Sequence, residues 1–465
     1  MSAIIHFGAD GWRARTDGEF TEDNVKRVAD AVAAIWSRGS NGSIVYVGYD
    51  ARPQAGEFAR VAAETIASHG LTVKLSSRFV PTPALSWTVA HDADACGGFM
   101  ITGSHHPMDY LGVKLRVADG GGGTRDFIDE VERGIDPDPL DERGPVEMCD
   151  IMTSYLENVC SLVDDKVIRA ANLRVVCDPM YGSARGYLAE ALRSLGVTVD
   201  EIHGEDAPDM EEMRPEAIEP WVDECEQAVA VPGICAGLIT DGDADRAGAV
   251  DENGRYVSPQ KIIALLIGEL SEGKGEKGRI VLSLSTSMLP RRVARTMGCR
   301  VTVKPIGFEY IYTEMLKGDV LLGGEESGGV GLPSHVPARD GLLTCLLLVE
   351  LMAKTGMTLG RLVASLEERY GVLCYSRRDL RLEADVIESL RNLLPGINPP
   401  RVAGMEPIRV SHMDGLRLDF ADESWLLVRP GGTEQVVRVY AEAPTVEQRD
   451  DLIEAGCAIA RGESV

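Results

Sequence analysis

A hydroxyl, two imidazoles and a cation lie close together in one part of the sequence. The segment 102–107, with the sequence TGSHHP, contains Ser104 and His105, and Lys114 follows shortly after it. The apolar run 97–101 is typical of a buried strand, and a serine between a glycine and a proline is expected in an exposed turn. A nucleophile, a proton acceptor and a positive charge in one loop suit covalent catalysis, although an ordinary turn can have the same residues.

Three carboxylates alternate along the segment 241–246, with the sequence DGDADR. Asp241, Asp243 and Asp245 would point to one side of an extended loop, and their repulsion is costly unless a cation neutralises it. Hard oxygen ligands suit Mg²⁺. A calcium-hand loop is an alternative because Glu252 falls at the twelfth position, but Arg246 stands where that loop requires glycine. A solvated acidic turn is the second alternative.

A glycine-rich segment at 323–329, with the sequence GGEESGG, has residue types that suit a sugar. Glu325 and Ser327 are two positions apart, so both could face sugar hydroxyls, and glycines allow the backbone to approach a ligand. The segment 268–274 (GELSEGK) has the spacing of a nucleotide P-loop. It follows a predicted helix, however, and a glycine comes next, so we reject that interpretation.

Another glycine-containing segment lies near the C-terminus, between two predicted strands. Arg429 is followed by Pro430, Gly431, Gly432 and Thr433. A guanidinium, N–H groups exposed by glycines and a hydroxyl can form an anion-binding nest, so the segment is predicted to bind a phosphate. An ordinary hairpin turn is the alternative.

The order of predicted elements indicates three similar units and a different fourth one. The first three alternate strands and helices, which is typical of parallel α/β folds, whereas the fourth has consecutive strands. Strands are expected at 44–49, 71–75, 97–101, 173–177, 197–202, 236–240, 279–283, 301–304, 320–322, 375–382, 408–411, 415–420, 425–428 and 436–442. Helices are expected at 54–69, 84–91, 149–163, 182–195, 220–229, 259–270, 289–297, 309–316, 358–369 and 446–460.

The predicted fold class is therefore α/β, with three tandem mixed domains, a C-terminal α+β domain with an antiparallel sheet, and a central cleft. The Pro- and Asp-rich stretch 136–141 is expected at a domain edge. The expected domains are 1–145, 146–254, 255–370 and 371–465. The N-terminal segment 7–13, with the sequence FGADGWR, is predicted to be a tight loop more than a strand.

Charge and cysteine content limit the possible partners. The net charge of −26 disfavours nucleic acid and anionic membranes, so an anionic ligand must be captured by local cations. The ten cysteines show no disulfide framework or zinc pattern, and we expect buried thiols at Cys96, Cys177, Cys235 and Cys345. No signal peptide is visible, and the longest apolar run, 342–352, is too short to span a bilayer. A cytoplasmic location is expected.

Together these segments resemble the α-D-phosphohexomutases, the phosphoglucomutase and phosphomannomutase family, over nearly the whole chain. The segment 102–107 resembles the family's phosphoserine motif TASHNP and is called the serine loop here. The aspartate loop (241–246) resembles DGDxDR, the sugar loop (324–329) GExSGH, the phosphate loop (429–434) RPSGTE, and the segment 7–13 FGTxGxR. The departures from these motifs lie at Gly103, His106, Gly329 and Gly431, and Glu309 stands where a lysine is often found.

The resemblance implies a mutase that acts on sugar phosphates. Ser104 would carry a phosphoryl group, donate it to a hexose monophosphate and regain one from the hexose 1,6-bisphosphate. Mg²⁺ would be bound by Asp241, Asp243, Asp245 and Ser104. His105 would orient the serine loop, Arg13 would contact the transferring phosphate, and Lys114 and Arg246 would add positive charge or move a proton. Glu325 and Ser327 would hold sugar hydroxyls, and Arg429, Gly431, Gly432 and Thr433 would bind the other phosphate.

Two other classes of function stay open. A phosphatase would pass the phosphoryl group to water, and a non-catalytic sugar-phosphate sensor would have an incomplete nucleophile or metal set. Gly329 in place of histidine favours glucose over mannose, with mannose and glucosamine phosphates as alternatives. The oligomeric state is open.

Overall fold

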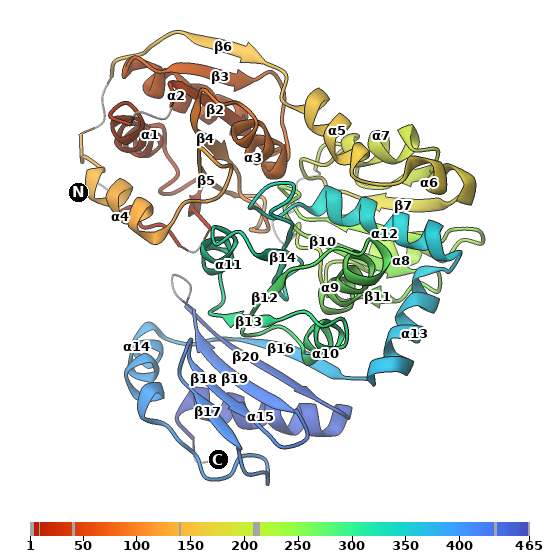
Figure 1. Ribbon diagram of the computed structural model, residues 1–465. Helices are drawn as coiled ribbons and strands as arrows, with labels where there is room; N and C mark the ends of the chain where they lie inside the picture. The colour runs from red at the N-terminus through yellow and green to blue at the C-terminus, as the bar shows by residue number, and fades with distance from the viewer. Residues whose placement is uncertain are drawn as a thin grey trace.

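The computed structural model describes residues 4–8, 10–39, 42–138, 141–207, 214–431 and 435–463. Its strands form four sheets that follow one another along the chain, and helices pack against them (Figure 1). The first three sheets contain parallel and antiparallel pairs, and the fourth contains antiparallel pairs throughout its described strands. The predicted fold class is confirmed.

The first sheet has a parallel centre that is covered on both faces. Its strands, in sheet order, are β1 (Trp12–Arg15), β5 (Tyr110–Val117), β4 (Ala95–Ile101), β2 (Ile44–Tyr49), β3 (Thr72–Ser76) and β6 (Val146–Cys149). The helices of this unit are α1 (Glu22–Trp36), α2 (Ala55–Ser68), α3 (Thr82–Ala90) and α4 (Arg125–Gly134). Val45 and Val47 join the core that includes α1 and α2, whereas Tyr46 joins the core that includes α3, because successive side chains of a strand point to opposite faces.

The second and third sheets repeat this plan. The second has the order β11 (Tyr256–Val257), β10 (Ala247–Asp251), β9 (Ala236–Thr240), β7 (Arg174–Asp178) and β8 (Thr198–Glu201). The third has the order β13 (Val301–Lys304), β12 (Arg279–Ser283), β14 (Val320–Gly324) and β15 (Val330–Gly331). Their helices are α5 (Met152–Ser161), α6 (Asp165–Ala171), α7 (Tyr187–Ser194), α8 (Asp223–Val229), α9 (Pro259–Gly268), α10 (Met288–Thr296), α11 (Phe308–Met315), α12 (Gly341–Thr355) and α13 (Leu359–Tyr370).

The fourth sheet is a meander of four consecutive strands with a fifth, earlier strand added at one edge. Its order is β16 (Cys374–Arg381), β20 (Val436–Ala443), β19 (Trp425–Pro430), β18 (Leu416–Asp419) and β17 (Arg409–Ser411). The helices α14 (Ala384–Leu393) and α15 (Val446–Arg461) contribute to its core. This unit occupies the blue part of Figure 1 and lies beside the third unit.

Each loop with predicted function connects two strands that are antiparallel neighbours. The serine loop joins β4 to β5, the aspartate loop joins β9 to β10, the sugar loop joins β14 to β15, and the phosphate loop joins β19 to β20. In the first three sheets the strand before the loop also has a parallel neighbour. The loop therefore leaves the sheet at the carboxyl end of parallel strands, where ligands bind in α/β proteins.

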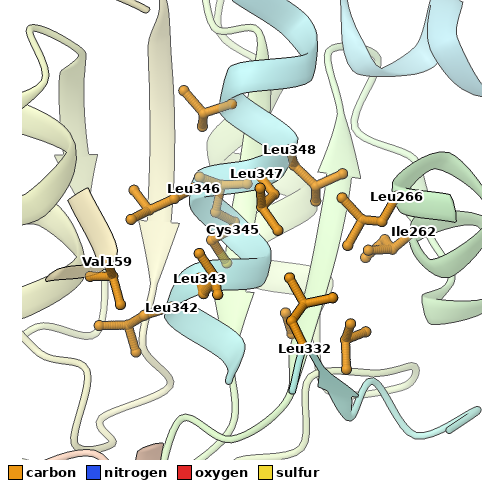
Figure 2. Close-up of a cluster of buried hydrophobic side chains, with 14 of the residues drawn as sticks. Val159, Ile262, Leu266, Leu332, Leu342, Leu343, Cys345, Leu346, Leu347 and Leu348 are labelled. Atoms are coloured by element: carbon orange, nitrogen blue, oxygen red, sulfur yellow. The ribbon is translucent and has the colours of Figure 1, made fainter. Parts of the chain in front are cut away.

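Helix α12 holds the second and third units together. Its leucines lie between Val159 of α5 and the pair Ile262 and Leu266 of α9 (Figure 2), and residues 341–352 are all buried. A helix that is apolar on every side is expected in a core. Asp340 caps it, since its carboxylate accepts a hydrogen bond from the N–H of Leu343 at 2.9 Å. The cap fixes the segment that leads into the central cavity.

Three local predictions need correction. The turn that contains Ser104 is not exposed at that residue, because Ser104 is buried at 1% exposure. The segment 7–13 is not only a loop, because β1 begins at Trp12 and pairs with β5, a partner distant in sequence. The Trp12 side chain is buried and its ring stacks on Phe20 with centroids 5.2 Å apart, which favours the strand. All ten cysteines are free, but Cys235 is half-buried, whereas the other three predicted buried thiols are buried.

The sheets suggest slightly different domain boundaries from those expected. Because β6 pairs with β3 and β11 pairs with β10, we propose that the first unit ends after Cys149 and the second after Val257. We keep the boundary at residue 370 as a proposal. Among the described residues no single helix is long and apolar enough to cross a membrane, and one pair bent by 82°, α12 with α13, passes the length and composition test.

Candidate functional site

Loops from all four units line one cavity of about 570 Å³. Its wall includes seven of the predicted site residues: Arg13, Ser104, His105, Arg246, Glu325, Ser327 and Arg429. Lys114 and the three aspartates are buried next to this wall and contact one another. Gly432 and Thr433 lie outside the described residues.

Ser104 is held in an unusual conformation at the cavity wall. Its φ of 49° lies in the left-handed region, which is uncommon for a residue with a side chain and often marks a functional site. The Oγ donates a hydrogen bond to Oδ2 of Asp241 at 3.3 Å, and Nδ1 of His105 lies 3.4 Å from it. The structure thus brings the predicted hydroxyl, imidazole and aspartate loop close together.

Arg52, which the sequence analysis missed, holds the serine loop from behind. Its guanidinium donates to the carbonyl oxygens of Ser104 at 2.7 Å and His106 at 2.6 Å, and also to those of Pro107 and Tyr110. The position of Gly103 makes this possible, because a Cβ there would lie 2.3 Å from the Arg52 Cζ. A single buried cation therefore fixes the path of the loop.

We expect Arg52→Lys to lower kcat about tenfold or more with little change in KM. A lysine ammonium cannot reach four carbonyl groups in the fixed fork of a guanidinium, so the loop should lose its geometry. Steady-state kinetics and thermal unfolding check this, with the exposed Arg60→Lys as the matched control. An Arg52→Lys protein with unchanged kcat would contradict the role.

The three aspartates form a group that fits a divalent metal ion. Their carboxylate oxygens lie within 4.8 Å of one another, and all three side chains are buried. The Nζ of Lys114 lies 2.6 Å from Oδ2 of both Asp243 and Asp245, while their Oδ1 atoms have no hydrogen-bond partner. Buried acceptors without a partner are costly, and a hard cation would satisfy them.

The protonation of this cluster shows how strongly it needs positive charge. Burial, together with Asp245 and Asp243, holds the pKa of Asp241 well above its usual value. Burial also tends to raise the pKa of Asp243, but the charge of Lys114 and its hydrogen bond hold the pKa of that carboxyl below its usual value. The pKa of Lys114 is raised despite burial, because Asp10, Asp243 and Asp245 surround it. Lys114 therefore supplies positive charge and keeps its proton at neutral pH.

The calcium-hand alternative is excluded by the position of Glu252. Its carboxylate accepts hydrogen bonds from Thr358 Oγ1 at 2.6 Å and from the N–H of Gly360 at 2.8 Å, at the start of α13. The P-loop-like segment 268–274 follows helix α9, as predicted.

His105 and His106 are neutral. Burial, followed by the positive charge of Arg246, lowers the pKa of His105 well below its usual value. Burial and Arg13 lower the pKa of His106 to about 3. A neutral His105 beside Ser104 can accept a proton or a hydrogen bond, which suits the predicted orienting role.

The part of the cavity beside Arg429 contains more arginines than the motif alone predicts. Arg429 is held by Asp414, whose Oδ2 lies 2.8 Å from its Nε and also accepts from the N–H of Ile306 at 2.9 Å. Arg438 is directly opposite Arg429 across the β19–β20 pair and also lines the cavity. The N–H of Gly431 donates a hydrogen bond to the carbonyl oxygen of Val436 at 2.7 Å. In this structure the N–H is therefore not free to bind a phosphate, which differs from the prediction.

Positive charge is concentrated at this cavity although the chain as a whole is acidic. Six arginines line it, namely Arg13, Arg246, Arg339, Arg377, Arg429 and Arg438, together with four acids, Asp10, Glu216, Glu325 and Glu326. The like charges of Arg429 and Arg438 lie directly opposite each other, and each is partly offset by an acid, Asp414 at 2.8 Å and Asp379 at 3.6 Å. The cavity can therefore bind an anion against the net charge of −26.

Sequence reasoning missed Arg339, Arg377 and Arg438 as well as Arg52. Arg52 lies three residues after the end of strand β2, so its place near the carboxyl end of a parallel strand was a usable signal. Arg377 and Arg438 lie inside strands and Arg339 precedes a helix, with no local motif around them.

Comparisons with known proteins identify relatives along most of the chain. Residues 5–140, 153–254 and 258–370 match the family models of phosphoglucomutase/phosphomannomutase alpha/beta/alpha domains I, II and III, and residues 383–457 match the C-terminal domain. A phosphoglucomutase/phosphomannomutase of Thermococcus kodakarensis is 28% identical over 97% of each chain. A phosphoglucosamine mutase of Parafrankia sp. is 30% identical over 96% of each chain.

A solved structure shows the same arrangement. A protein of Thermus thermophilus, assigned as a phosphomannomutase, has a TM-score of 0.88 and 33% identity, with 99% of this chain and 100% of that chain covered. The similarity extends over all four units, as expected if the loops act together.

Proposed function

The chain belongs to the phosphoglucomutase/phosphomannomutase family of isomerases, and we propose that it interconverts hexose 1-phosphates and hexose 6-phosphates through a phosphoserine at Ser104. The observation that carries the proposal is the meeting of the four loops at one cavity. Ser104 and the aspartate loop lie at one part of its wall, and Arg429 with Arg438 at another. A substrate with two phosphate positions would contact both groups at once.

The roles of the residues follow from their contacts. Ser104 Oγ carries the phosphoryl group, and its transfer to a sugar hydroxyl breaks the Oγ–P bond, forms a bond from phosphorus to the sugar oxygen and moves the hydroxyl proton to the serine Oγ. His105 orients Ser104, and Arg13 and Arg246 provide positive charge along the cavity. Lys114 keeps Asp243 and Asp245 in place from the side opposite their unpartnered oxygens. Enclosure between four units limits attack by water on the phosphoserine.

Asp241, Asp243 and Asp245 would hold Mg²⁺, with Ser104 beside it. When bound, Mg²⁺ would neutralise charge at the transferring phosphoryl group. The hexose 1,6-bisphosphate would be both intermediate and activator.

The identity of the hexose is a finer question. The sequence favours glucose because Gly329 lacks the histidine of phosphomannomutase-like sugar loops. Relatives named phosphoglucosamine mutase support glucosamine phosphate as a second candidate, and relatives named phosphomannomutase support mannose phosphate.

We expect glucose 1-phosphate to give the highest kcat/KM among the 1-phosphates of glucose, mannose, glucosamine and N-acetylglucosamine. These substrates differ at one carbon, a difference of a few kcal/mol when a buried hydrogen bond is at stake. A coupled assay of all four, side by side, checks this. A higher kcat/KM for glucosamine 1-phosphate would replace glucose with the amino sugar and leave the mutase reaction intact.

We expect Arg429→Ala to raise KM strongly for glucose 1-phosphate and glucose 6-phosphate alike. Loss of a charge-assisted contact to a buried phosphate costs roughly 2–5 kcal/mol, and the same site must hold the idle phosphate in both directions. The exposed Arg401→Ala in the same unit is the matched control. A variant impaired in one direction only would show that the idle phosphate is bound elsewhere.

A further inference from the structure

Arg339 contacts acidic residues from three of the four units beside the cavity. Its side chain is 5% exposed. One terminal nitrogen, Nη2, pairs with Asp10 of the N-terminal segment and lies 2.7 Å from Oδ2 of Asp245 in the aspartate loop. The other, Nη1, donates to Oε2 of Glu325 in the sugar loop at 3.1 Å. One guanidinium thus joins the serine-loop unit, the aspartate loop and the sugar loop.

The backbone of Arg339 is held firmly by its neighbours. The next residue, Asp340, caps α12 and also accepts hydrogen bonds from Tyr155 OH at 2.9 and 3.0 Å. His335 Nε2 lies 2.9 Å from the same carboxylate. The guanidinium lies over the ring of Phe308, 5.4 Å from its centroid. The backbone of Arg339 and its guanidinium are therefore both held in place, which fixes the direction of the side chain between them.

Gly329 gives Arg339 the space that it occupies. A Cβ at this position would lie 2.3 Å from Cδ of Arg339 and 3.2 Å from Oε2 of Glu325. Any larger residue at 329 would push the arginine stem aside. The absence of a side chain at Gly329 therefore does not leave an empty pocket, because the stem of Arg339 fills it.

We propose that Arg339 is a positioning residue for the sugar loop: it fixes the carboxylate of Glu325 relative to the aspartate loop, so that sugar and transferring phosphoryl group meet in one geometry. The inference rests on the proposed function, because it uses the assignment of Glu325 to the sugar. A guanidinium can bridge several acids in a fixed plane, which a lysine ammonium cannot do. We therefore expect Arg339→Lys to restore only part of what Arg339→Met removes.

A double-mutant cycle tests the link between Arg339 and Glu325. Arg339→Met and Glu325→Gln should each raise KM for the preferred hexose phosphate about tenfold or more. The KM of the double variant should be little higher than the larger of the two single-variant values, because both changes break the same interaction. Arg279→Met is the matched control, since Arg279 is also buried in the third unit between two acids, Glu314 and Asp319, but does not line the cavity. It should unfold at a lower temperature with unchanged KM.

The pH dependence of kcat/KM is a second measurement, and it would not change if Arg339 only stabilised the fold. Burial raises the pKa of Glu325 and Arg339 opposes this, while Arg246, Glu326 and Glu309 are the other charged groups that act on it. Without Arg339 the carboxyl should take up a proton at higher pH. The acidic limb of the kcat/KM profile should therefore move to higher pH in Arg339→Met and move less in Arg339→Lys.

Gly329→Ala tests the same idea without changing a charge. The new methyl group should displace Arg339 and raise KM as Arg339→Met does, whereas Gly396→Ala, with no atom near the added Cβ, should have no effect.

Additive effects in the cycle, or an unchanged KM in Arg339→Met, would overturn the proposal. If the protein shows no turnover on any of the four hexose phosphates, the mutase proposal fails. The cycle is then read from calorimetric binding of glucose 1-phosphate, and absence of binding to the unmodified protein would overturn this inference too.

Discussion

Ser104→Ala should lose turnover by a factor on the order of 10⁴ or more while it still binds hexose phosphate, because the variant keeps the cavity but lacks the atom that carries the phosphoryl group. The serine Oγ is the group that lies between Asp241 and His105, at 3.3 and 3.4 Å. Intact mass spectrometry of the unmodified protein should show a fraction heavier by one phosphoryl group, and peptide mapping should place it on Ser104. Preincubation with hexose 1,6-bisphosphate should increase this fraction.

Ser183→Ala is the matched control for this experiment. Ser183 is also buried, its backbone N–H donates to the carbonyl of Gly242 in the aspartate loop, and its Oγ has no hydrogen-bond partner. It should keep full activity and the same phosphorylated fraction. Phosphate mapped to another residue would refute the assignment. Steady release of inorganic phosphate from glucose 1-phosphate, without isomerisation, would indicate the phosphatase alternative.

Strands with strong local patterns were predictable from the sequence. β2, β9, β12 and β13 have the predicted bounds, because each is a short run rich in β-branched and other strand-forming residues. The antiparallel partners β5, β10 and β15 were not predicted. The sequence of β5 does alternate, with apolar residues at 111, 113, 115 and 117 separated by Gly112, Lys114 and Arg116, so its strand signal was present and was overlooked. Tertiary contacts decided β15, which has two residues and no pattern of its own.

Helix α12 shows a second reason for missed structure. The apolar run was recognised, but a helix that is buried on all sides has no polar face and hence no helical period. Its Asp340 cap was the usable signal. Helix α1 also has a local signal that was overlooked, since Thr21 accepts a hydrogen bond from the N–H of Asn24.

The site residues can also be divided into those that were predictable from the local sequence and those that were not. Residues grouped in short motifs, such as Ser104 and Asp243, could be selected because their chemistry is visible in a few adjacent positions. Arg52 and Arg339 act through partners far away in sequence, and their roles depend on space left by glycines. The position of Arg52 after β2 indicates its place but not its partners, and Arg339 has no local signal, so the residues that position a site are harder to predict than those that react.

Asp243→Asn is expected to lower turnover by two orders of magnitude or more, because it removes one of three carboxylates that would hold the metal ion next to the transferring group. Asparagine has nearly the same shape, and its side-chain oxygen can still accept from Thr82 Oγ1, now 2.6 Å from Oδ2. The fold should therefore persist while the affinity for the ion falls. Chelation of the unmodified protein should abolish activity, and Mg²⁺ should restore it.

Metal affinity can be measured without activity, by titration of the chelated proteins with Mg²⁺ in a calorimeter and with Mn²⁺ by electron paramagnetic resonance. Asp251→Asn is the matched control, because Asp251 is buried at the other end of β10 from the aspartate loop and accepts hydrogen bonds from the backbone N–H groups of Asn253 and Arg255. It should bind the ion as tightly as the unmodified protein. Full turnover in thoroughly chelated protein, or equal Mn²⁺ affinity in Asp243→Asn, would contradict the assignment. In that case Lys114 and Arg339 would be the cations that neutralise these carboxylates, as their distances of 2.6 and 2.7 Å to Asp245 allow.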